Sequence, residues 1–400
     1  MRALTRLAPA ALAFAVTLGL ACKDSNAPRA IPQTIAKLAG DTQLALTGTP
    51  LDDSLVVRVV GSGGSPFAGA VVTWAVTSGS ATLGAPSGTT NSQGQAFTTV
   101  TLGGTPGPVA VQASVTSLTP VTFTATACDH PGIALGDTVT GVLATSDCRI
   151  NGYYTDFFEL PAATGPQGVR LTMTGAFDTW LEMYRPAGFV AVNDDIDSTT
   201  TNSQIDAIVP ADAYLVEPSS FSLFTTGAYS LSAEARTAGL AGCGLVWTTR
   251  GVVISDSVTT TDCVDSTGGV QHYADIVAMY LEAGTVLTVS HKSTSFDAAL
   301  FLHNGAGVSV ASNNDSAGVP TNAFIQYPVA LSGGYLLFVA TNTNAPSATG
   351  PYTLTISSST TVSGSAPLQR QGPQVLRVAP LRMPKGRLQR LWSPAARRTM

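Results

Sequence analysis

Charged residues are scarce in this 400-residue sequence, where Asp, Glu, Lys and Arg together make up 11%. Long helices depend on Glu, Lys and Arg as helix formers, so this deficit argues against a helical protein. The sequence instead has Val- and Thr-rich runs broken by Gly, Pro, Asn and Asp, which are typical of short strands joined by turns. We therefore predict an all-β protein, and its length indicates about three domains.

Recognisable catalytic motifs are also lacking. The sequence has no Gly-x-Ser-x-Gly nucleophile elbow and no His-Glu-x-x-His zinc motif. Its four histidines show no spacing typical of metal ligands. We predict that the protein is not an enzyme. The alternative is a cryptic hydrolase whose Ser-His-Asp triad is assembled from distant residues, since the chain order of a triad is not fixed.

Long apolar runs are absent except at the start of the chain. Leu7 to Ala21 is uncharged and apolar, follows Arg2 and Arg6, and is too short to span a bilayer as a mature helix. The run ends in Gly19-Leu20-Ala21-Cys22, which resembles a bacterial lipoprotein signal. That family usually has Leu, Val or Ile where this sequence has Gly19.

The resemblance implies that residues 1–21 are a signal peptide and that Cys22 is lipidated after cleavage. The exported protein would then be held by this lipid on a membrane of the cell envelope, at the outer membrane or cell surface, with polar residues 22–33 as a tether. The alternative is an ordinary signal peptide cut nearby, with Cys22 lost or idle.

Cysteines are few, five in all, and four of them form two equally spaced pairs. Cys128 and Cys148 are 20 residues apart, as are Cys243 and Cys263. In an exported protein such pairs indicate disulfides. Four cysteines allow three connectivities, and an internal duplication selects 128–148 with 243–263. Closing a loop of about 20 residues contributes roughly 3 kcal/mol by restricting the unfolded chain.

The duplication covers residues 128–235 and 243–358, which carry the same landmarks in the same order. The matching pairs are Tyr154-Thr155-Asp156 with Tyr273-Ala274-Asp275, Phe177-Asp178 with Phe296-Asp297, Asn193-Asp194-Asp195 with Asn313-Asn314-Asp315, and Gly227-Ala228-Tyr229 with Gly350-Pro351-Tyr352. Both blocks are rich in strand patterns with repeating hydrophobic faces. We therefore expect each copy to bury its own core.

Residues 34–127 also read as strands, at roughly ten-residue spacing with turn signals between them, which suggests a β-sandwich. In Ala70 to Val76 the alternation puts Trp74 on an inward face, where it is large enough to anchor a core. The motifs Pro66-x-x-Gly69-x-Val71-Val72-x-Trp74, Thr89-x-Asn91-x-x-Gly94-Gln95-Ala96 and Gly107-x-Val109-x-Val111-x-Ala113 resemble a bacterial immunoglobulin-like domain of the invasin/intimin type. This resemblance implies a stalk or adhesion module without catalytic residues.

The two copies resemble the bacterial pre-peptidase C-terminal (PPC) domain. Each matches its pattern of an aromatic-Asp pair, an apolar strand, an Asn-Asp-Asp turn and a closing Gly-x-Tyr strand. That family is a small β-sandwich often found beside secreted proteases, whereas this sequence shows no protease domain. We therefore expect three tandem sandwiches, one immunoglobulin-like and two jelly-roll-like.

The acidic turns are the candidate metal sites. Calcium takes six to eight oxygen ligands, and each copy places several Asn and Asp side chains within a few residues. The candidate ligands are Asp178, Asn193, Asp194, Asp195 and Asp197 in the first copy, and Asp297, Asn313, Asn314 and Asp315 in the second. The alternative is that these residues stabilise tight turns by bonding their own backbone.

The charges are unevenly distributed along the chain. Residues 361–400 hold eight basic residues and no acid, which leaves 12 basic and 25 acidic residues in the rest, a net charge of −13. An acidic body does not suit nucleic acid. The basic, proline-rich tail is predicted to be disordered. It would bind anionic lipid or cell-wall polymer, or simply be solvated.

These observations predict a non-catalytic, exported surface lipoprotein that acts as a binding, adhesion or spacer module. Its partners would be the membrane, through Cys22, and an envelope or extracellular protein or polysaccharide. The alternative is an accessory protein that binds substrate or protease in trans with a secreted hydrolase. The sequence identifies neither the ligand nor the oligomeric state.

Overall fold

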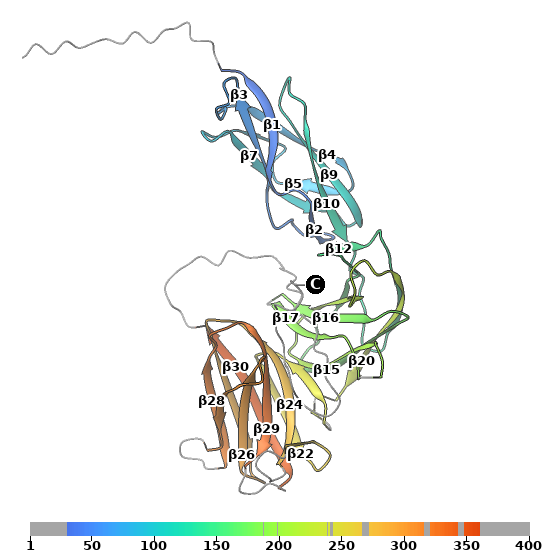
Figure 1. The fold of residues 1–400 in the computed structure, drawn as a ribbon, viewed down its shortest axis with the longest axis vertical. Coiled ribbons are helices and arrows are strands. Elements are labelled where there is room, and N and C mark those ends of the chain that lie inside the picture. The colour runs from blue at the N-terminus through green and yellow to red at the C-terminus, as the bar shows by residue number, and fades with distance from the viewer. Residues whose placement is uncertain are drawn as a thin grey trace, which may run out of the picture.

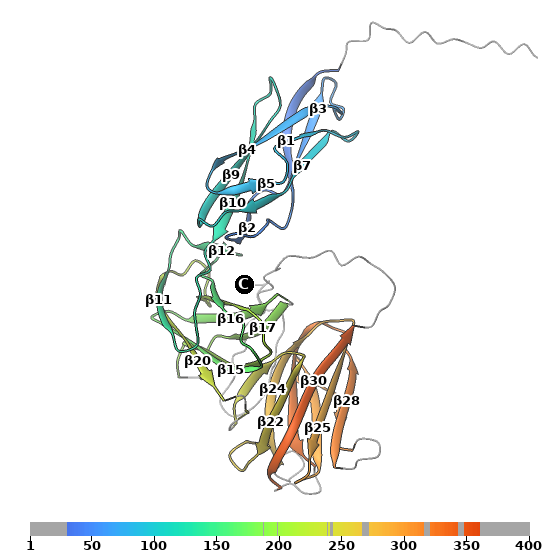
Figure 2. The ribbon, with the colours of Figure 1, turned by 180° about the vertical axis from the view of Figure 1, so that it is seen from behind.

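The computed structural model describes residues 30–360, apart from 187, 198, 238, 241–242, 266–271, 316–320 and 343–347. The signal peptide, Cys22, most of the tether and the basic tail lie outside the described residues, so the predictions on them stay predictions. The described residues form strands, turns and bends, and no described helix could cross a membrane. The prediction of an all-β chain of tandem sandwiches is confirmed (Figures 1 and 2).

The first sandwich contains ten strands in three sheets, ordered β1-β3-β7, β2-β10-β9-β4-β6 and β5-β8. The strands are β1 (Pro32–Ala39), β2 (Gln43–Leu46), β3 (Leu55–Gly61), β4 (Val71–Ser78), β5 (Ala81–Leu83), β6 (Ser87–Thr89), β7 (Gln95–Thr98), β8 (Val100–Leu102), β9 (Gly107–Ser114) and β10 (Val121–Cys128). Trp74 is buried in the core, 5.9 Å between ring centroids from Phe123, as its position in the alternation predicted.

The second sandwich is built from two facing sheets, ordered β11-β20-β15-β18 and β12-β13-β19-β16-β17, with β14 paired to β19. Its strands are β11 (Thr138–Leu143), β12 (Cys148–Ile150), β13 (Tyr153–Thr155), β14 (Phe158–Leu160), β15 (Gln167–Gly175), β16 (Thr179–Arg185), β17 (Gly188–Asn193), β18 (Ser203–Val209), β19 (Tyr214–Ser220) and β20 (Gly227–Arg236). Asn151 and Gly152 join β12 to β13 with φ of 50° and 92°, which suits the primed turn of a two-residue hairpin.

The third sandwich repeats this plan, with β22-β30-β25-β28 facing β24-β29-β26-β27 and with β23 paired to β24. Its strands are β21 (Leu245–Thr248), β22 (Val252–Val258), β23 (Cys263–Asp265), β24 (His272–Leu281), β25 (Thr285–Ser293), β26 (Ala298–Asn304), β27 (Ser309–Asn313), β28 (Asn322–Pro328), β29 (Gly333–Thr341) and β30 (Gly350–Thr360). The registers match between the copies, since Leu181 pairs with Asn193 where Leu300 pairs with Asn313.

The short strand β21 connects the second and third sandwiches through the backbone. It pairs in parallel with β18 of the second sandwich and with β24 of the third, so one sheet runs through both. Its side chains alternate between the two cores: Val246 belongs to the core of the third sandwich and Trp247 to that of the second. The two sandwiches therefore share a strand and not merely a linker.

Candidate functional site at the domain junctions

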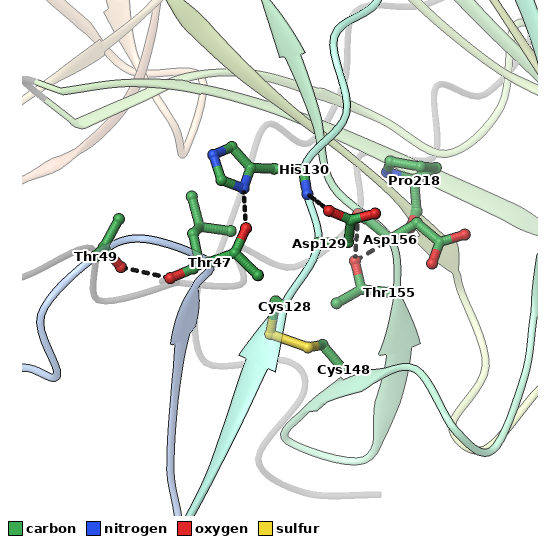
Figure 3. The surroundings of a disulfide bond; sticks show 10 residues. Thr47, Thr49, Cys128, Asp129, His130, Cys148, Thr155, Asp156 and Pro218 are labelled. Carbon is green, nitrogen blue, oxygen red and sulfur yellow. Dashed lines mark hydrogen bonds between the residues drawn. A yellow bond between two sulfur atoms is a disulfide. The ribbon is translucent and has the colours of Figure 1, made fainter. Parts of the chain in front are cut away.

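The first disulfide lies where the first sandwich meets the second (Figure 3). Cys128 is the last residue of β10, and Cys148 is the first residue of β12. Their Cα atoms are 5.8 Å apart. Because one sulfur belongs to the end of the first sandwich and the other to a strand of the second, the bond ties two domains together.

Hydrogen bonds and apolar packing support this disulfide. The backbone N–H of Thr47 donates to the carbonyl of Cys128 at 2.8 Å, and the Thr47 hydroxyl lies 3.1 Å from His130 Nδ1 (Figure 3). A separate apolar cluster covers the junction and draws on both domains: Leu44, Leu46, Cys128, Cys148, Ile150, Phe157 and Leu215. The first junction is therefore a packed interface with a covalent crosslink.

The second disulfide occupies the equivalent place before the third sandwich. Cys243 precedes β21, and Cys263 opens β23, with Cα atoms 4.3 Å apart. The disulfide pairing predicted from the duplication is thus confirmed at both places. Each disulfide joins the start of a copy to a short strand of the same copy, β12 in the first and β23 in the second. Both bonds lie next to the junction with the preceding domain.

Two of the repeated landmarks, the Asp after the first aromatic residue and the closing Tyr, meet within each copy. The Tyr229 hydroxyl donates to Asp156 at 2.6 Å, and the Tyr352 hydroxyl donates to Asp275 at the same distance. Burial raises the pKa of Asp156 to about 6 and that of Asp275 to about 8, despite the hydrogen bond from each tyrosine. These two landmarks therefore form an internal polar link between the two sheets of each sandwich.

The second copy adds a histidine to its buried link. His291 is fully buried, its Nδ1 lies 3.2 Å from the carbonyl of Ala299, and its ring meets Tyr352 edge-on at 4.9 Å. Burial lowers the pKa of His291 to about 4, so the imidazole is neutral at ordinary pH. In the first copy Met173 occupies the equivalent position, so the histidine is not required by the fold.

The acidic turns of the two copies begin with Asn193 and Asn313, which lie at equivalent positions. The side chain of each asparagine bonds a backbone N–H group. Asn193 Oδ1 accepts from the N–H of Gln204, and Asn313 Oδ1 accepts from that of Phe324, both at 2.8 Å. These bonds fix the turn after β17 and β27, as the alternative interpretation of the acidic turns expects.

The remaining candidate ligands differ in exposure. Asp194 is buried, and burial together with neighbouring Asp195 raises its pKa to about 7. Asp197 Oδ1 accepts from Thr199, and Asp297 Oδ2 accepts from Asn342 at 2.6 Å. Asp178 accepts through its carbonyl from Phe221, while Asn314 and Asp315 are exposed. Within the described residues no three His, Cys, Asp or Glu side chains come together as a metal cluster, and calcium binding stays a prediction.

Sequence reasoning missed a pair of buried glutamates in the second sandwich. Glu182 on β16 and Glu217 on β19 are register partners, and both are fully buried. The Tyr184 hydroxyl donates to Glu182 at 2.6 Å. The available signal was one acid inside an otherwise apolar strand, Trp180 to Tyr184, but cross-strand register is needed to bring the second acid beside it.

Replacing Cys128 and Cys148 by serine should lower the free energy of unfolding by about 3 kcal/mol, because the unfolded chain regains the freedom of a loop of about 20 residues. Urea denaturation of the oxidised protein and of this double variant measures the difference. The Cys243→Ser/Cys263→Ser variant serves as a matched comparison. An unchanged midpoint for both variants would contradict a stabilising role.

Replacing Asp275 by Asn should flatten the pH dependence of stability. The folded-state pKa of about 8 lies above the ordinary value of 3.8, so the folded protein holds this proton more tightly, and stability is lost as pH rises towards 8. The slope is at most about 1.4 kcal/mol per pH unit, which corresponds to roughly 3–6 °C in melting temperature per pH unit. Thermal melts from pH 4 to 9 test this, and equal slopes in wild type and variant would contradict it.

Neither a protein-family model nor a curated protein matches this chain. Among solved structures, the pre-peptidase C-terminal domain of a collagenase from Bacillus anthracis is 12% identical, covering 27% of this chain and 96% of its own, with a TM-score of 0.23. The D00-D0 domain of intimin is 25% identical, covering 23% and 46%, with a TM-score of 0.18. Tripeptidyl peptidase 2 is 12% identical, covering 80% and 33%, with a TM-score of 0.29. The structural neighbours thus include both domain types that the sequence motifs resemble, and scores this low carry no argument about function.

Proposed function

We propose that this protein is an exported, non-catalytic component of the cell envelope that acts as a stiff spacer and presents binding surfaces away from its anchor. The observation that carries the proposal is the construction of its junctions. The first is closed by a disulfide and an apolar cluster, and the second by a disulfide and a shared strand. Junctions of this kind resist bending, which a spacer requires and a flexible linker does not provide.

An aromatic cluster adds to the stiffness of the second junction. Phe189 of β17 lies 6.2 Å from Trp247 of β21 and 5.4 Å from Tyr280 of β24, measured between ring centroids. The three rings therefore come from the second sandwich, the shared strand and the third sandwich. Edge-on contacts between aromatic rings stabilise a structure beyond the effect of the apolar area that they bury.

Two features support export and a non-catalytic role. Two disulfides suit a compartment outside the cytoplasm. Four groups in the third sandwich have pKa values that depart strongly from the ordinary range, and all are buried inside the fold: Asp275, His291, Tyr335 and Tyr352. Side chains sealed in this way stabilise or tune a fold and do not meet a substrate, in contrast to perturbed groups in an open cleft.

Replacing Trp247 by Ala should loosen the second junction while both sandwiches stay folded. Loss of a buried tryptophan costs about 3–5 kcal/mol locally, and here the loss falls between two domains. Small-angle X-ray scattering should show a broader distribution of interatomic distances. Trp74→Ala is the matched control, because it removes the same side chain from a core inside one domain. Equal scattering from wild type and Trp247→Ala would count against a stiff spacer.

Affinity capture from a cell-envelope fraction tests the binding role. Full-length protein should retain a wall polymer or an envelope or extracellular protein. Retention of a secreted hydrolase would instead favour the accessory role in trans. Hydrolytic activity of the purified protein, seen as labelling by serine-hydrolase probes, would refute the non-catalytic proposal.

A further inference from the structure

Strand β11 forms a free edge of the long sheet that runs through the second and third sandwiches. It is the first strand in the order of that sheet, and among the described residues it pairs only with β20. In an antiparallel pair, every second residue of an edge strand directs its N–H and C=O groups away from its neighbour. The outer edge of β11 therefore presents a row of backbone donors and acceptors. Figure 2 shows β11 on the outer side of the bend formed by the three sandwiches.

This edge lacks the usual protection against a further strand. Proteins commonly protect an edge with charged side chains, proline, a bulge or a covering segment. Residues 138–143 read Thr-Val-Thr-Gly-Val-Leu, with no charged residue and no proline. Their register with β20 is continuous, and the Val142 side chain is 58% exposed. The edge is thus regular, rich in β-branched residues and suited to pairing.

The equivalent edge strand of the third sandwich, β22, is protected. Gly141 pairs with Tyr229, and Asp256 occupies the corresponding position opposite Tyr352. The Asp256 carboxylate accepts from the backbone N–H of Leu240, so the chain before β21 is bound to β22 through this side chain. Gly141 leaves no room for such a group, because a Cβ atom there would lie 2.3 Å from the Tyr229 ring. The open edge is therefore a property of the second sandwich.

A hollow of about 630 Å³ begins at β11 and crosses the outer face of the sheet. Its lining residues come from three strands and one loop: Thr140 and Val142 of β11, Ala228 and Tyr229 of β20, Thr174 of β15, and Asn202. Neighbouring strands lie about 4.8 Å apart, and large side chains also contact their diagonal neighbours on the next strand. An aromatic side chain on a strand added beside β11 is therefore long enough to enter the hollow.

The third sandwich has larger side chains at the equivalent place. Pro351 stands in the position of Ala228, and Lys292 stands in the position of Thr174. Because the fold accommodates these larger residues, the small ones of the second sandwich are not required by its packing. The open edge and the small residues beside it thus coincide in one copy, as a binding surface requires.

The charge around β11 indicates what kind of segment this surface fits. Residues 129–148 contain Asp129, Asp137 and Asp147 and neither lysine nor arginine. Asp137 and Asp147 each accept from a backbone N–H in the turns that flank β11, so their carboxylates are held near its two ends. Antiparallel pairing of β11 with a second copy would bring these acids towards each other, which is unfavourable. A segment with lysine or arginine at its ends is complementary instead.

We propose that the second sandwich binds an extended segment of a partner protein by strand addition at β11. The segment adds its backbone to the free edge, places a large apolar side chain in the hollow, and carries basic residues beside Asp137 and Asp147. This interaction rests on the proposed binding role and identifies the surface that performs it. It does not depend on stiff junctions, so the scattering result for Trp247→Ala and the binding result for β11 are independent.

Hydrogen–deuterium exchange of the full-length protein tests strand addition, with the synthetic peptide Lys-Val-Thr-Phe-Thr-Val-Lys as the probe. Exchange should slow several-fold at residues 138–143 and stay unchanged at residues 252–258 of β22, because main-chain hydrogen bonds form at the free edge. The control probe is the same peptide with its five central residues N-methylated, which removes the ladder donors and should leave exchange unchanged. Unaltered exchange at β11 with the unmethylated peptide would overturn the proposal.

The variant Val142→Glu separates strand addition from simple charge attraction. It adds an acid near a basic probe, so attraction alone would tighten binding. Loss of the apolar cross-strand contact should instead weaken binding about fivefold. The matched control is Val253→Glu, because Val253 is 57% exposed on β22, and this variant should bind the probe like wild type. Tighter binding by Val142→Glu than by wild type would contradict the proposal.

Two further measurements test the hollow and the identity of the partner. A probe with alanine in place of phenylalanine should bind about tenfold more weakly, because the hollow stays unfilled. Equal affinity of the two probes would contradict the role of the hollow. Wild type should sediment as a monomer in analytical ultracentrifugation. A dimer that Val142→Glu dissociates would show that β11 pairs with a second copy, and would overturn binding of a different partner.

Discussion

The architecture depends on one backbone interaction, the pairing of β21 on both of its edges. A strand bonded on two sides cannot rotate relative to either neighbour without breaking a ladder, so β18 and β24 are held in a single sheet on either side of β21. Val246 and Trp247 reinforce this because adjacent side chains on the strand enter different cores. Bending at the second junction therefore requires disrupting two hydrophobic cores, whereas a loop of the same length would bend freely.

The first junction reaches stiffness by a different route. It has no shared central strand, and its crosslink joins Cys128 at the end of β10 to Cys148 on β12. In the first copy the parallel contact corresponding to β21 shrinks to a bridge between Gly132 and Glu159. The disulfide and the surrounding apolar cluster thus hold an interface where the backbone ladder is short. Both junctions therefore have a disulfide, and the second adds the backbone pairing of β21 to it.

The sequence predicted the features that are written in local patterns. Strand periodicity predicted the sandwiches, and equal cysteine spacing within a duplication predicted both disulfides. The sequence showed the repeated Asp and Tyr residues but not the hydrogen bond between them. Asp156 and Tyr229 are far apart in the sequence, and only the fold brings them together. Sheet continuity through β21 and the adjacency of Glu182 and Glu217 depend on register between strands. No single-strand pattern contains that information.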